Sequence, residues 1–331
     1  MAKCLVTGGT GFVGSYIVRL LVNRGHEVSV LLRESSSTDL IKDLTFTKVT
    51  GDVRDIQSLE QGISNDIDWL FHNAAIMADW GSKSHFFPVN VEGTRNILEE
   101  VRKKDIPKLI YTSSTAVYGF PNKDEPISET TPWKPINNYQ KSKAAAEILV
   151  HQYMAKYGVK ASMVRSPAVV GRGDMFTGPQ IIERLKNRNM VTFGGGNNNQ
   201  SFVHGEDFAN CLILAAENFQ RANGNVYNVA SFDCTMKQFL DALATQLNVE
   251  KKYMNFPYWS AVAIGAFLGG LYRAFNRRNA PALTSFRVKM FGSKYLIDTS
   301  KARRELGFAP KWNLETTAKD MVEWGGFIKP R

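Results

Sequence analysis

Cysteine is scarce in this sequence. The 331 residues include three, Cys4, Cys211 and Cys234, which stand far apart in apolar surroundings without the spacing of metal ligands. Such usage disfavours a disulfide framework, a catalytic thiol and a metal site. We expect buried thiols in a reducing, cytoplasmic environment and no metal. The sequence also lacks internal repeats and low-complexity tracts, so it predicts a globular fold with room for a large domain and a smaller lobe.

Acidic residues are outnumbered. The 31 Asp and Glu face 41 Lys and Arg, which gives a formal net charge of +10. A basic protein attracts anions such as a phosphorylated cofactor, an acidic substrate, a membrane surface or a nucleic acid. The positive charges are scattered, however, and no nucleic-acid-binding module is recognisable. We therefore expect a small-molecule ligand and no nucleic-acid partner.

A glycine-rich stretch, Thr7–Gly14, joins the apolar run Cys4–Val6 to an amphipathic helical pattern. Glycines at this spacing allow a tight turn, close approach of phosphates and close packing of helix on strand. The N-terminus of the helix offers free N–H groups and partial positive charge to an anion. We predict a dinucleotide pyrophosphate site made by Gly8, Thr10, Gly11, Phe12, Val13 and Gly14.

Strand-like and helical segments alternate through the first half of the chain. Strands are expected at residues 4–6, 27–32, 46–50, 67–71 and 108–113, with helices between them that include residues 88–104. This order predicts an α/β fold with a Rossmann-type doubly wound parallel sheet, whose ligands bind at the carboxyl ends of the strands. We expect His72 to be structural. Five residues at these ends are predicted to contact the cofactor: Asp52, Val53, Asn73, Ala74 and Ala75. Asp52 is expected to accept a hydrogen bond from the adenine amino group.

The choice of cofactor depends on the end of the second strand. An acidic residue there suits the ribose hydroxyls of NAD, whereas arginine suits the 2′-phosphate of NADP. This chain has Arg33, followed by small hydroxyl residues that include Ser36. The sequence therefore favours NADP, with NAD as the alternative.

Three polar residues follow the fifth strand at positions that suit proton transfer. Tyr139 and Lys143 are four apart and share one face of a helix, and Ser114 follows the strand. An adjacent ammonium and an oxidised nicotinamide are expected to lower the pKa of the Tyr139 phenol. In this arrangement Tyr139 exchanges the proton, Ser114 holds the substrate oxygen, and Lys143 holds the nicotinamide ribose, while the nicotinamide carries the hydride.

These motifs together resemble the extended short-chain dehydrogenases/reductases of the NAD-dependent epimerase/dehydratase superfamily. The motifs that carry the resemblance are Thr7–Gly14, Gly51–Val53, His72–Ala75, Asn90–Thr94, Ser113–Gly119, Tyr139 with Lys143, and Phe202–Asp207. The resemblance implies an NADP-binding Rossmann domain at 1–166, to which 202–230 return, and a substrate lobe at 167–201 and 231–331. It also implies that Asn90 helps to organise the cofactor site, although a helix cap is an equal alternative, and that the protein forms a homodimer.

Within that family, two positions bear on the substrate. Sugar-nucleotide enzymes carry an Asn after the sixth strand and an Arg before the Phe-Val-His run, and this chain has Ala168 and Gln200 in the corresponding places. The pattern from Arg165 to Asp174 looks more like the 3β-hydroxysteroid dehydrogenase and dihydroflavonol reductase branch, with Pro167 and Val169 beside the nicotinamide.

The resemblance implies an NADP-dependent oxidoreductase that interconverts a secondary alcohol and a ketone. The expected substrate is apolar, such as a sterol or other isoprenoid, a β-keto lipid or a polyphenol. Two alternatives remain open. One is an NDP-sugar epimerase or dehydratase, and the other is a catalytically idle nicotinamide-binding sensor or subunit.

The most apolar stretch covers residues 257–272 and is followed by Arg273, Arg277 and Arg278. It is too short to span a bilayer, which takes about twenty apolar residues. One interpretation is an interfacial helix whose aromatic side chains enter lipid while the arginines meet acidic headgroups. The other is a cover over the substrate pocket of a soluble enzyme. A peripheral membrane contact through 257–278 is thus one expectation.

Overall fold

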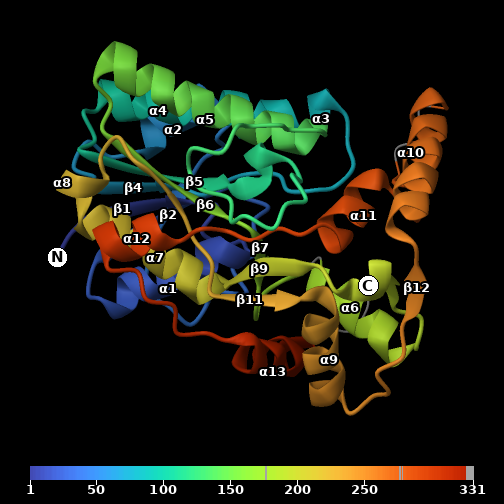
Figure 1. Ribbon diagram of the computed structural model, residues 1–331. Coiled ribbons are helices and arrows are strands. Elements are labelled where there is room, and N and C mark those ends of the chain that lie inside the picture. The colour runs from blue at the N-terminus through green and yellow to red at the C-terminus, as the bar shows by residue number, and fades with distance from the viewer. Residues whose placement is uncertain (176, 276, 278, 326–331) are drawn as a thin grey trace.

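A computed structural model describes residues 1–175, 177–275, 277 and 279–325. Its centre is a seven-stranded sheet with the order β10-β6-β5-β4-β1-β2-β3 (Figure 1). All six neighbouring pairs are parallel. The predicted Rossmann-type doubly wound sheet is therefore confirmed. The strands are β1 (Lys3–Thr7), β2 (Glu27–Leu32), β3 (Thr47–Thr50), β4 (Trp69–His72), β5 (Lys108–Ser114), β6 (Ala161–Ser166) and β10 (Val226–Asn228).

The central strands are buried on both faces because helices cover both faces of the sheet. Every residue of β4 and of β6 is buried. The register aligns Thr7 at the end of β1 with Leu31 on one side and His72 on the other. The strand order reverses between β1 and β4, which is where a doubly wound sheet offers a crevice to a ligand.

Helices form a layer on each face of the sheet (Figure 1). Two hydrophobic cores lie between these layers and the sheet. One layer contributes residues such as Ile17 and Phe208 to one core, and the other layer contributes residues such as Ile97 and Leu149 to the other core. The first layer comprises α1 (Phe12–Asn23), α7 (Gly205–Glu217), α8 (Phe219–Ala222) and α12 (Ser300–Leu306). The second comprises α2 (Ile56–Gly62), α4 (Gly93–Lys103) and α5 (Asn138–Tyr157).

The single helix expected at residues 88–104 is wrong in its details. The structure has α3 (Lys83–Phe87), a π-helical turn η1 (Pro88–Glu92) and then α4. Pro88 lacks an N–H, so regular α-helical bonding cannot continue through it from α3. The π-helical turn η1 takes the place of regular α-helix here, and it carries the buried residue Asn90.

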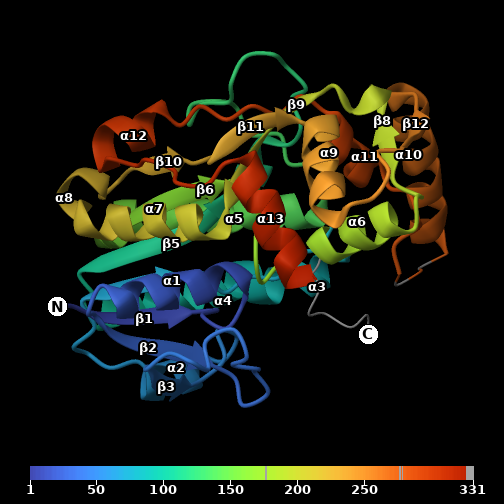
Figure 2. The ribbon, with the colours of Figure 1, turned by 90° about the horizontal axis from the view of Figure 1, so that it is seen from below.

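The remaining strands and helices form a smaller part of the molecule. Strands β7 (Ala168–Val170), β9 (Asn199–His204) and β11 (Phe232–Thr235) form one sheet, and β8 (Val191–Phe193) pairs with β12 (Met254–Phe256). Figure 2 shows the larger helices of this part on one side of the large sheet. These helices are α6 (Thr177–Lys186), α9 (Met236–Leu247), α10 (Tyr258–Ala274), α11 (Ser285–Gly292) and α13 (Leu314–Gly325). The short turn η3 (Gly194–Gly196) follows β8, whereas the turn η2 (Thr115–Tyr118) directly follows β5 of the large sheet.

The chain passes between these two parts more than once. It leaves the large sheet after Ser166 and rejoins it through α7, which packs on α1, and through β10, which pairs with β6. The exact division at 1–166, 167–201, 202–230 and 231–331 stays a prediction.

Two expectations about composition can be compared with the structure. All three cysteines are free and buried, as predicted. In the described ranges of the chain, no helix is long and apolar enough to cross a membrane.

Candidate active site

The glycine-rich turn between β1 and α1 is tightly packed on one side and open on the other. Gly8 has φ +66°, and a Cβ there would lie 2.8 Å from the backbone of Ala74. A Cβ on Gly14 would lie 2.0 Å from the carbonyl oxygen of Gly8. Gly11, by contrast, is exposed, and its nearest such neighbour is the same oxygen at 3.4 Å. Gly8 and Gly14 permit the tight turn, and Gly11 leaves open space beside it.

The N-terminus of α1 opens toward that space. Gly11 is its N-cap residue and provides no side-chain capping bond. Thr10, Phe12 and Val13 are half-buried around the turn. A helix N-terminus of this kind, approached through an exposed glycine, fits a pyrophosphate group. The residues predicted for the dinucleotide phosphates therefore suit that group.

The loop after β4 is fastened to the glycine-rich turn. The hydroxyl of Thr7 accepts hydrogen bonds from the backbone N–H groups of Asn73 and Ala74 at 3.2 and 3.1 Å. The side-chain amide of Asn73 donates to the carbonyl oxygen of Gly8 at 3.3 Å. Ala74 is half-buried and Ala75 exposed. The ends of β1 and β4, predicted to flank the cofactor together, are thus held at a fixed separation.

His72 is structural, as expected. It is fully buried, and its Nδ1 and Nε2 lie 2.8 and 3.0 Å from the hydroxyls of Thr7 and Thr94. Thr94 already donates its own hydroxyl proton to the carbonyl oxygen of Asn90, so Nε2 carries the ring proton and Nδ1 accepts from Thr7. Burial, together with the nearby positive charge of Lys143, lowers the pKa of His72 to about 3.

The predicted adenosine contacts lie at the ends of β2 and β3. Arg33 is exposed, and its carbonyl oxygen accepts a turn bond from the N–H of half-buried Ser36. Asp52 is bound by the Arg54 guanidinium, which holds the pKa of that carboxyl below its usual range, and the charge of Arg33 contributes to the same effect. Val53 is buried. Arg33 and Asp52 therefore lie within electrostatic reach of each other, and Arg54 is a partner that the sequence reasoning missed.

Ser114 and Tyr139 are brought together although they are 25 positions apart in the chain. Ser114 ends β5, accepts from the N–H of Ala116 at 3.1 Å and donates to the carbonyl oxygen of Ser166 at 3.4 Å. Tyr139 lies in the first turn of α5, whose N-cap Asn137 accepts from a backbone N–H at 2.8 Å. Burial raises the pKa of Tyr139 to about 12, and a hydrogen bond with the Ser114 side chain offsets part of that rise.

The expected lowering of the pKa of Tyr139 is therefore wrong in this structure. The ammonium of Lys143 does not reach toward the phenol as the sequence reasoning supposed. It donates to the carbonyl oxygen of Thr112 at 2.7 Å and to the hydroxyl of Tyr111 at 3.1 Å. With the ammonium held elsewhere, the cost of burying a phenolate dominates.

Lys143 itself occupies an unusual position for a lysine. It is 4% exposed, and burial lowers its pKa to about 8, against the opposing effect of the negative charge of Glu147. Glu147 lies one turn further along α5 and binds the guanidinium of Arg165 through Nε at 3.1 Å. The i,i+4 spacing of Lys143 and Glu147 was visible in the sequence and could have identified this acidic neighbour.

Asn90 connects the loop after β4 to α5. Its side-chain oxygen accepts from the N–H of Ile76 at 2.7 Å, and its amide donates to the carbonyl oxygen of Ile76 at 3.0 Å and to the hydroxyl of Ser142 at 2.9 Å. This supports the organising role that was implied for Asn90, whereas the alternative of a helix cap is wrong because the residue lies inside η1.

The two apolar residues predicted beside the nicotinamide follow β6. The last residue of that strand, Ser166, accepts hydrogen bonds from both Ser114 and Thr115. Pro167 comes next and is buried, and Val169 in β7 is half-buried. Both therefore lie on a segment fastened to the end of β5.

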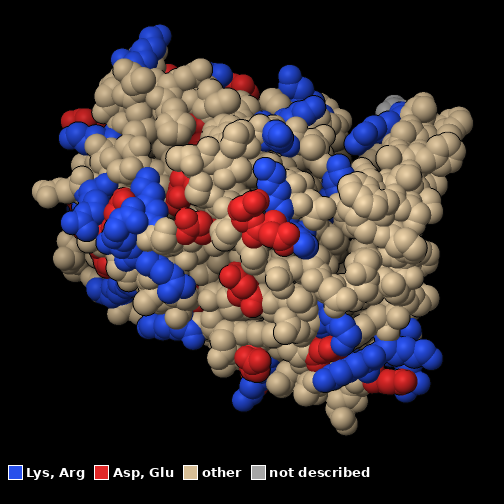
Figure 3. Space-filling model, viewed as in Figure 1, with Lys and Arg blue, Asp and Glu red and all other residues tan. Residues whose placement is uncertain are grey.

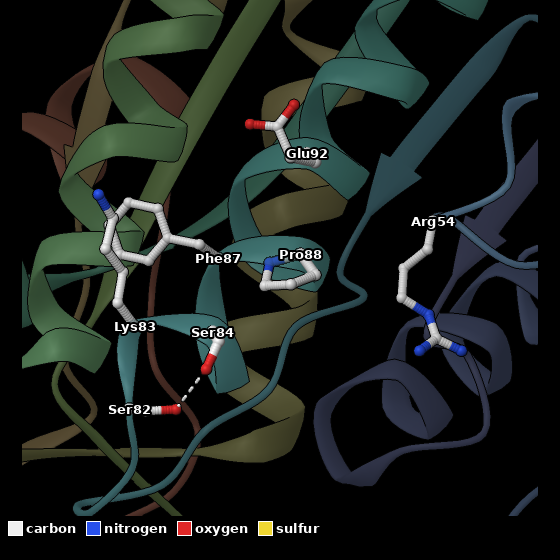
Figure 4. A pocket seen from close by; sticks show the side chains of 7 residues that line it. All are labelled: Arg54, Ser82, Lys83, Ser84, Phe87, Pro88 and Glu92. Carbon is white, nitrogen blue, oxygen red and sulfur yellow. Dashed lines mark hydrogen bonds between the residues drawn. The ribbon is translucent and has the colours of Figure 1, made fainter.

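An open hollow of about 710 Å³ borders Arg54, the partner of Asp52. It is bounded by Arg54, which follows β3, and by residues of α3 and η1 (Figure 4). Its lining residues are Arg54, Ser82, Lys83, Ser84, Phe87, Pro88 and Glu92. None of them is a predicted site residue, so this hollow is separate from the predicted catalytic group.

Comparison with known proteins agrees with this geometry. A sequence pattern described as the NAD dependent epimerase/dehydratase family matches residues 4–230. The chain belongs to this family. A 4-hydroxy-2-methyl-3-oxo-4-farnesyl-3,4-dihydroquinoline-1-oxide ketoreductase from Stigmatella aurantiaca is 29% identical, over 93% of this chain and 92% of its own. A 3-beta-hydroxysteroid dehydrogenase from Mycolicibacterium neoaurum is 28% identical, over 98% of this chain and 90% of its own.

A solved structure is similar over almost its whole length. The crystal structure of gox2253 matches with a TM-score of 0.83 and 27% identity, covering 98% of both chains. The predicted resemblance to the extended short-chain dehydrogenases/reductases is thereby confirmed. As a member of the epimerase/dehydratase family, the protein is an NAD(P)-dependent enzyme with a dinucleotide-binding Rossmann fold.

Proposed function

We propose that this chain is an NADP-dependent oxidoreductase that interconverts a secondary alcohol and a ketone on an apolar substrate. The observation that carries the proposal is the meeting of Ser114 with Tyr139, one helical turn from Lys143, at the carboxyl end of β5. Two relatives described as a ketoreductase and a hydroxysteroid dehydrogenase support the same reaction class. Both printed names refer to oxygenated carbons on largely apolar skeletons.

The protonated phenol of Tyr139 can serve as the proton donor when a ketone is reduced. With a pKa of about 12, the phenol is protonated at neutral pH and is in the form that donates a proton. In this proposal Ser114 positions the substrate oxygen, and Tyr139 delivers the proton to that oxygen. A bound nicotinamide cofactor supplies the hydride chemistry. Lys143, fixed by Thr112 and Tyr111, presents a positive charge on the same face of α5.

Two positions support an apolar substrate over a sugar nucleotide. Gln200 is buried, and its amide donates to the carbonyl oxygens of Met290 and Ser293 at 2.8 and 3.0 Å, so it serves the backbone of the smaller part. Ala168 is exposed and has no polar side-chain atom. Neither residue offers a group to a substrate diphosphate.

The preference for NADP rests on Arg33. Its exposed guanidinium follows β2 and is near Asp52, a place where a 2′-phosphate meets positive charge. The comparison of NADPH with NADH under identical conditions tests this preference. Equal kcat/KM for the two cofactors would contradict it.

We also propose that the protein is a homodimer, in keeping with the assembly implied by the family resemblance. The outer side of α5 offers Ile148, which is 45% exposed, as an apolar contact. Light scattering of the wild type and of Ile148→Asp measures this directly. A monomer in the wild type contradicts the proposal.

The first experiment incubates the purified protein and NADPH with parallel panels of apolar ketones and UDP- or dTDP-sugars. Absorbance follows the reduced nicotinamide while chromatography follows the substrate. Sustained loss of NADPH with a ketone is the expected result. Conversion of a sugar nucleotide without net consumption of cofactor identifies an epimerase, and cofactor binding without turnover on either panel identifies a nicotinamide-binding sensor or subunit.

A further inference from the structure

Helix α10 presents large apolar side chains to the outside of the molecule. Trp259, Phe267 and Phe275 are 73%, 70% and 69% exposed. We call the following set the α10 face: Met254, Phe256, Trp259, Ile264, Phe267, Leu271 and Phe275. The helix lies at the right-hand edge of the molecule in Figure 1, and the same edge in Figure 3 is mostly uncharged.

The distribution of residue sizes on α10 is the reverse of that on a helix facing water. Its buried side consists of small residues, Ala261, Gly265 and Gly269. A Cβ on Gly265 would lie 2.6 Å from the backbone nitrogen of Ser285, so α10 and α11 pack with their backbones close together. Surface helices bury their large apolar residues and expose polar ones. Large exposed apolar side chains gathered on one segment, as in the α10 face, are typical of a surface that binds a partner or a membrane.

The chain segment that carries the α10 face has charged residues of one sign. Residues 251–297 contain no Asp or Glu and eight Lys or Arg. Arg287 and Lys294 are neutralised by Asp79 and Asp124 from elsewhere in the chain. Exposed Arg273 lies with its guanidinium 5.1 Å from the ring centre of Trp80, and Arg277 is also exposed. Figure 3 shows basic side chains at the upper end of this edge. Arg278, which belongs to the same predicted segment, lies outside the described residues.

We propose that the α10 face binds the surface of a bilayer that contains anionic phospholipids. The helix lies in the interface, with Trp259, Phe267 and Phe275 among the upper acyl chains and Arg273 and Arg277 at the level of the headgroups. A second copy of this chain fits less well, because a symmetric contact would bring the same acid-free, basic segment against itself. The absence of a membrane-crossing helix among the described residues is compatible with contact at the surface.

The test is flotation of the full-length protein with vesicles, which is independent of enzymatic activity. Vesicles of phosphatidylcholine with about one-third phosphatidylglycerol are compared with vesicles of phosphatidylcholine alone, at low and high salt. The wild type is expected to float with the anionic vesicles and to dissociate as salt is raised. Failure to bind the anionic vesicles overturns the proposal.

Two pairs of variants separate the apolar from the electrostatic contribution. Phe267→Ser with Phe275→Ser is expected to weaken binding at least about tenfold, while Tyr157→Ser, 44% exposed at the far end of α5, leaves it unchanged. Arg273→Gln with Arg277→Gln is expected to weaken binding about twentyfold and to reduce its salt dependence. Lys48→Gln with Lys160→Gln changes net charge equally at other exposed sites and is expected to have a much smaller effect.

A contact between copies has a different signature. Light scattering on the same variants measures the mass in solution. If Phe267→Ser with Phe275→Ser dissociates an oligomer and leaves vesicle binding unchanged, the α10 face is an interface between copies and the membrane proposal is wrong. Equal loss in the Lys48 and Lys160 control shows unspecific attraction by net charge and also overturns it.

Discussion

Tyr139 is half-buried at the start of α5, where its hydroxyl meets Ser114 and its ring contacts the ring of Phe86. Tyr139→Phe removes one hydroxyl and preserves the ring that packs there. We expect kcat to fall by about 10²- to 10⁴-fold because the proton donor is lost. Stability and NADPH affinity should remain close to wild type, since the backbone contacts of the cofactor turn are untouched. Steady-state kinetics and calorimetric titration measure the two effects.

A matched control for that substitution lies on the same helix. Tyr157→Phe removes an exposed hydroxyl at the end of α5 and should leave kcat unchanged. Full activity in Tyr139→Phe would contradict the assigned role. A parallel loss in both variants would show that the helix, and not the phenol, had been disturbed.

His72 is expected to make stability depend on pH in mildly acidic solution. Its folded pKa of about 3 lies below the ordinary value of 6.5, so between these values the unfolded chain binds more protons. The free energy of unfolding therefore falls as pH decreases from about 6.5 toward 3, by up to about 1.4 kcal/mol per pH unit from this group. Urea unfolding of the wild type and of His72→Gln at several pH values measures the contribution.

The informative quantity is the difference in slope between those two proteins. His72→Gln lowers stability at neutral pH by the loss of packing, but it removes the titrating group, so its acid slope should be shallower. Identical slopes would show that the imidazole does not control acid stability.

Among single residues, the sequence identified those whose type carries the chemistry. Ser114, Tyr139 and Lys143 were predicted from residue type, spacing and position after a strand, and the structure places them at the end of one strand and the start of one helix. It missed Tyr111 as a partner of Lys143, because a tyrosine inside a strand has no sequence signal that distinguishes it from a core residue. The direction of the pKa shift of Tyr139 was also wrong, since burial is a tertiary property.

At the scale of elements, the turn between β1 and α1 allows two glycines to be compared. Gly14→Ala would place a Cβ 2.0 Å from the carbonyl oxygen of Gly8, so the helix must move off the strand. We expect destabilisation of about 3 kcal/mol or more, or failure to fold. Gly11 has φ −82° and only one neighbour, at 3.4 Å, so Gly11→Ala should fold with a stability within about 1 kcal/mol of the wild type.

The stable variant, Gly11→Ala, is expected to be the one that loses affinity for the cofactor. A methyl group on exposed Gly11 projects into the space predicted for the pyrophosphate, so NADPH affinity is expected to fall at least about tenfold in a stable protein. Thermal unfolding and fluorescence titration of the two variants provide the data. Unchanged NADPH affinity in Gly11→Ala would place the phosphates elsewhere.

The elements themselves were mostly predictable from pattern. The second strand at 27–32 matches the predicted range, because the alternation of apolar and polar residues is a local property. The range expected as one helix, 88–104, divides between Glu92 and Gly93 into η1 and α4, and α3 precedes it. The π-helical turn was not predictable, because it depends on Asn90 reaching Ile76 and Ser142 from elsewhere in the fold.

For the whole molecule, a buried ion pair joins several elements beneath the site. Arg165 on β6 binds Glu147 on α5, and Glu147 also accepts from Ser113 on β5. Burial alone would raise the pKa of the Glu147 carboxyl. Hydrogen bonds from neighbours that include His151 and Arg165 outweigh burial and lower this pKa to about 2. Glu147→Gln leaves the Arg165 charge buried without its counter-ion. We expect a loss of about 3–5 kcal/mol in the free energy of unfolding.

The double variant provides the control for that prediction. Glu147→Leu with Arg165→Met removes both charges, and it should cost less than the single Glu147→Gln substitution. Urea denaturation measures all three proteins. A single variant within about 1 kcal/mol of the wild type would show that water or another group compensates the arginine.

By itself, the sequence determined the fold class and the family, because strand and helix periodicity and glycine spacing are local properties of the chain. The reactive roles of Ser114, Tyr139 and Lys143 stay predictions. It also indicated that residues 257–278 are apolar and basic, without deciding between two positions for them. Only the tertiary structure decided which side of α10 is covered, since that depends on α11 packing against Gly265. In the same way, the environment of Tyr139 and Lys143 required β5, α5 and the loop after β4 to meet, and their pKa values follow from that burial.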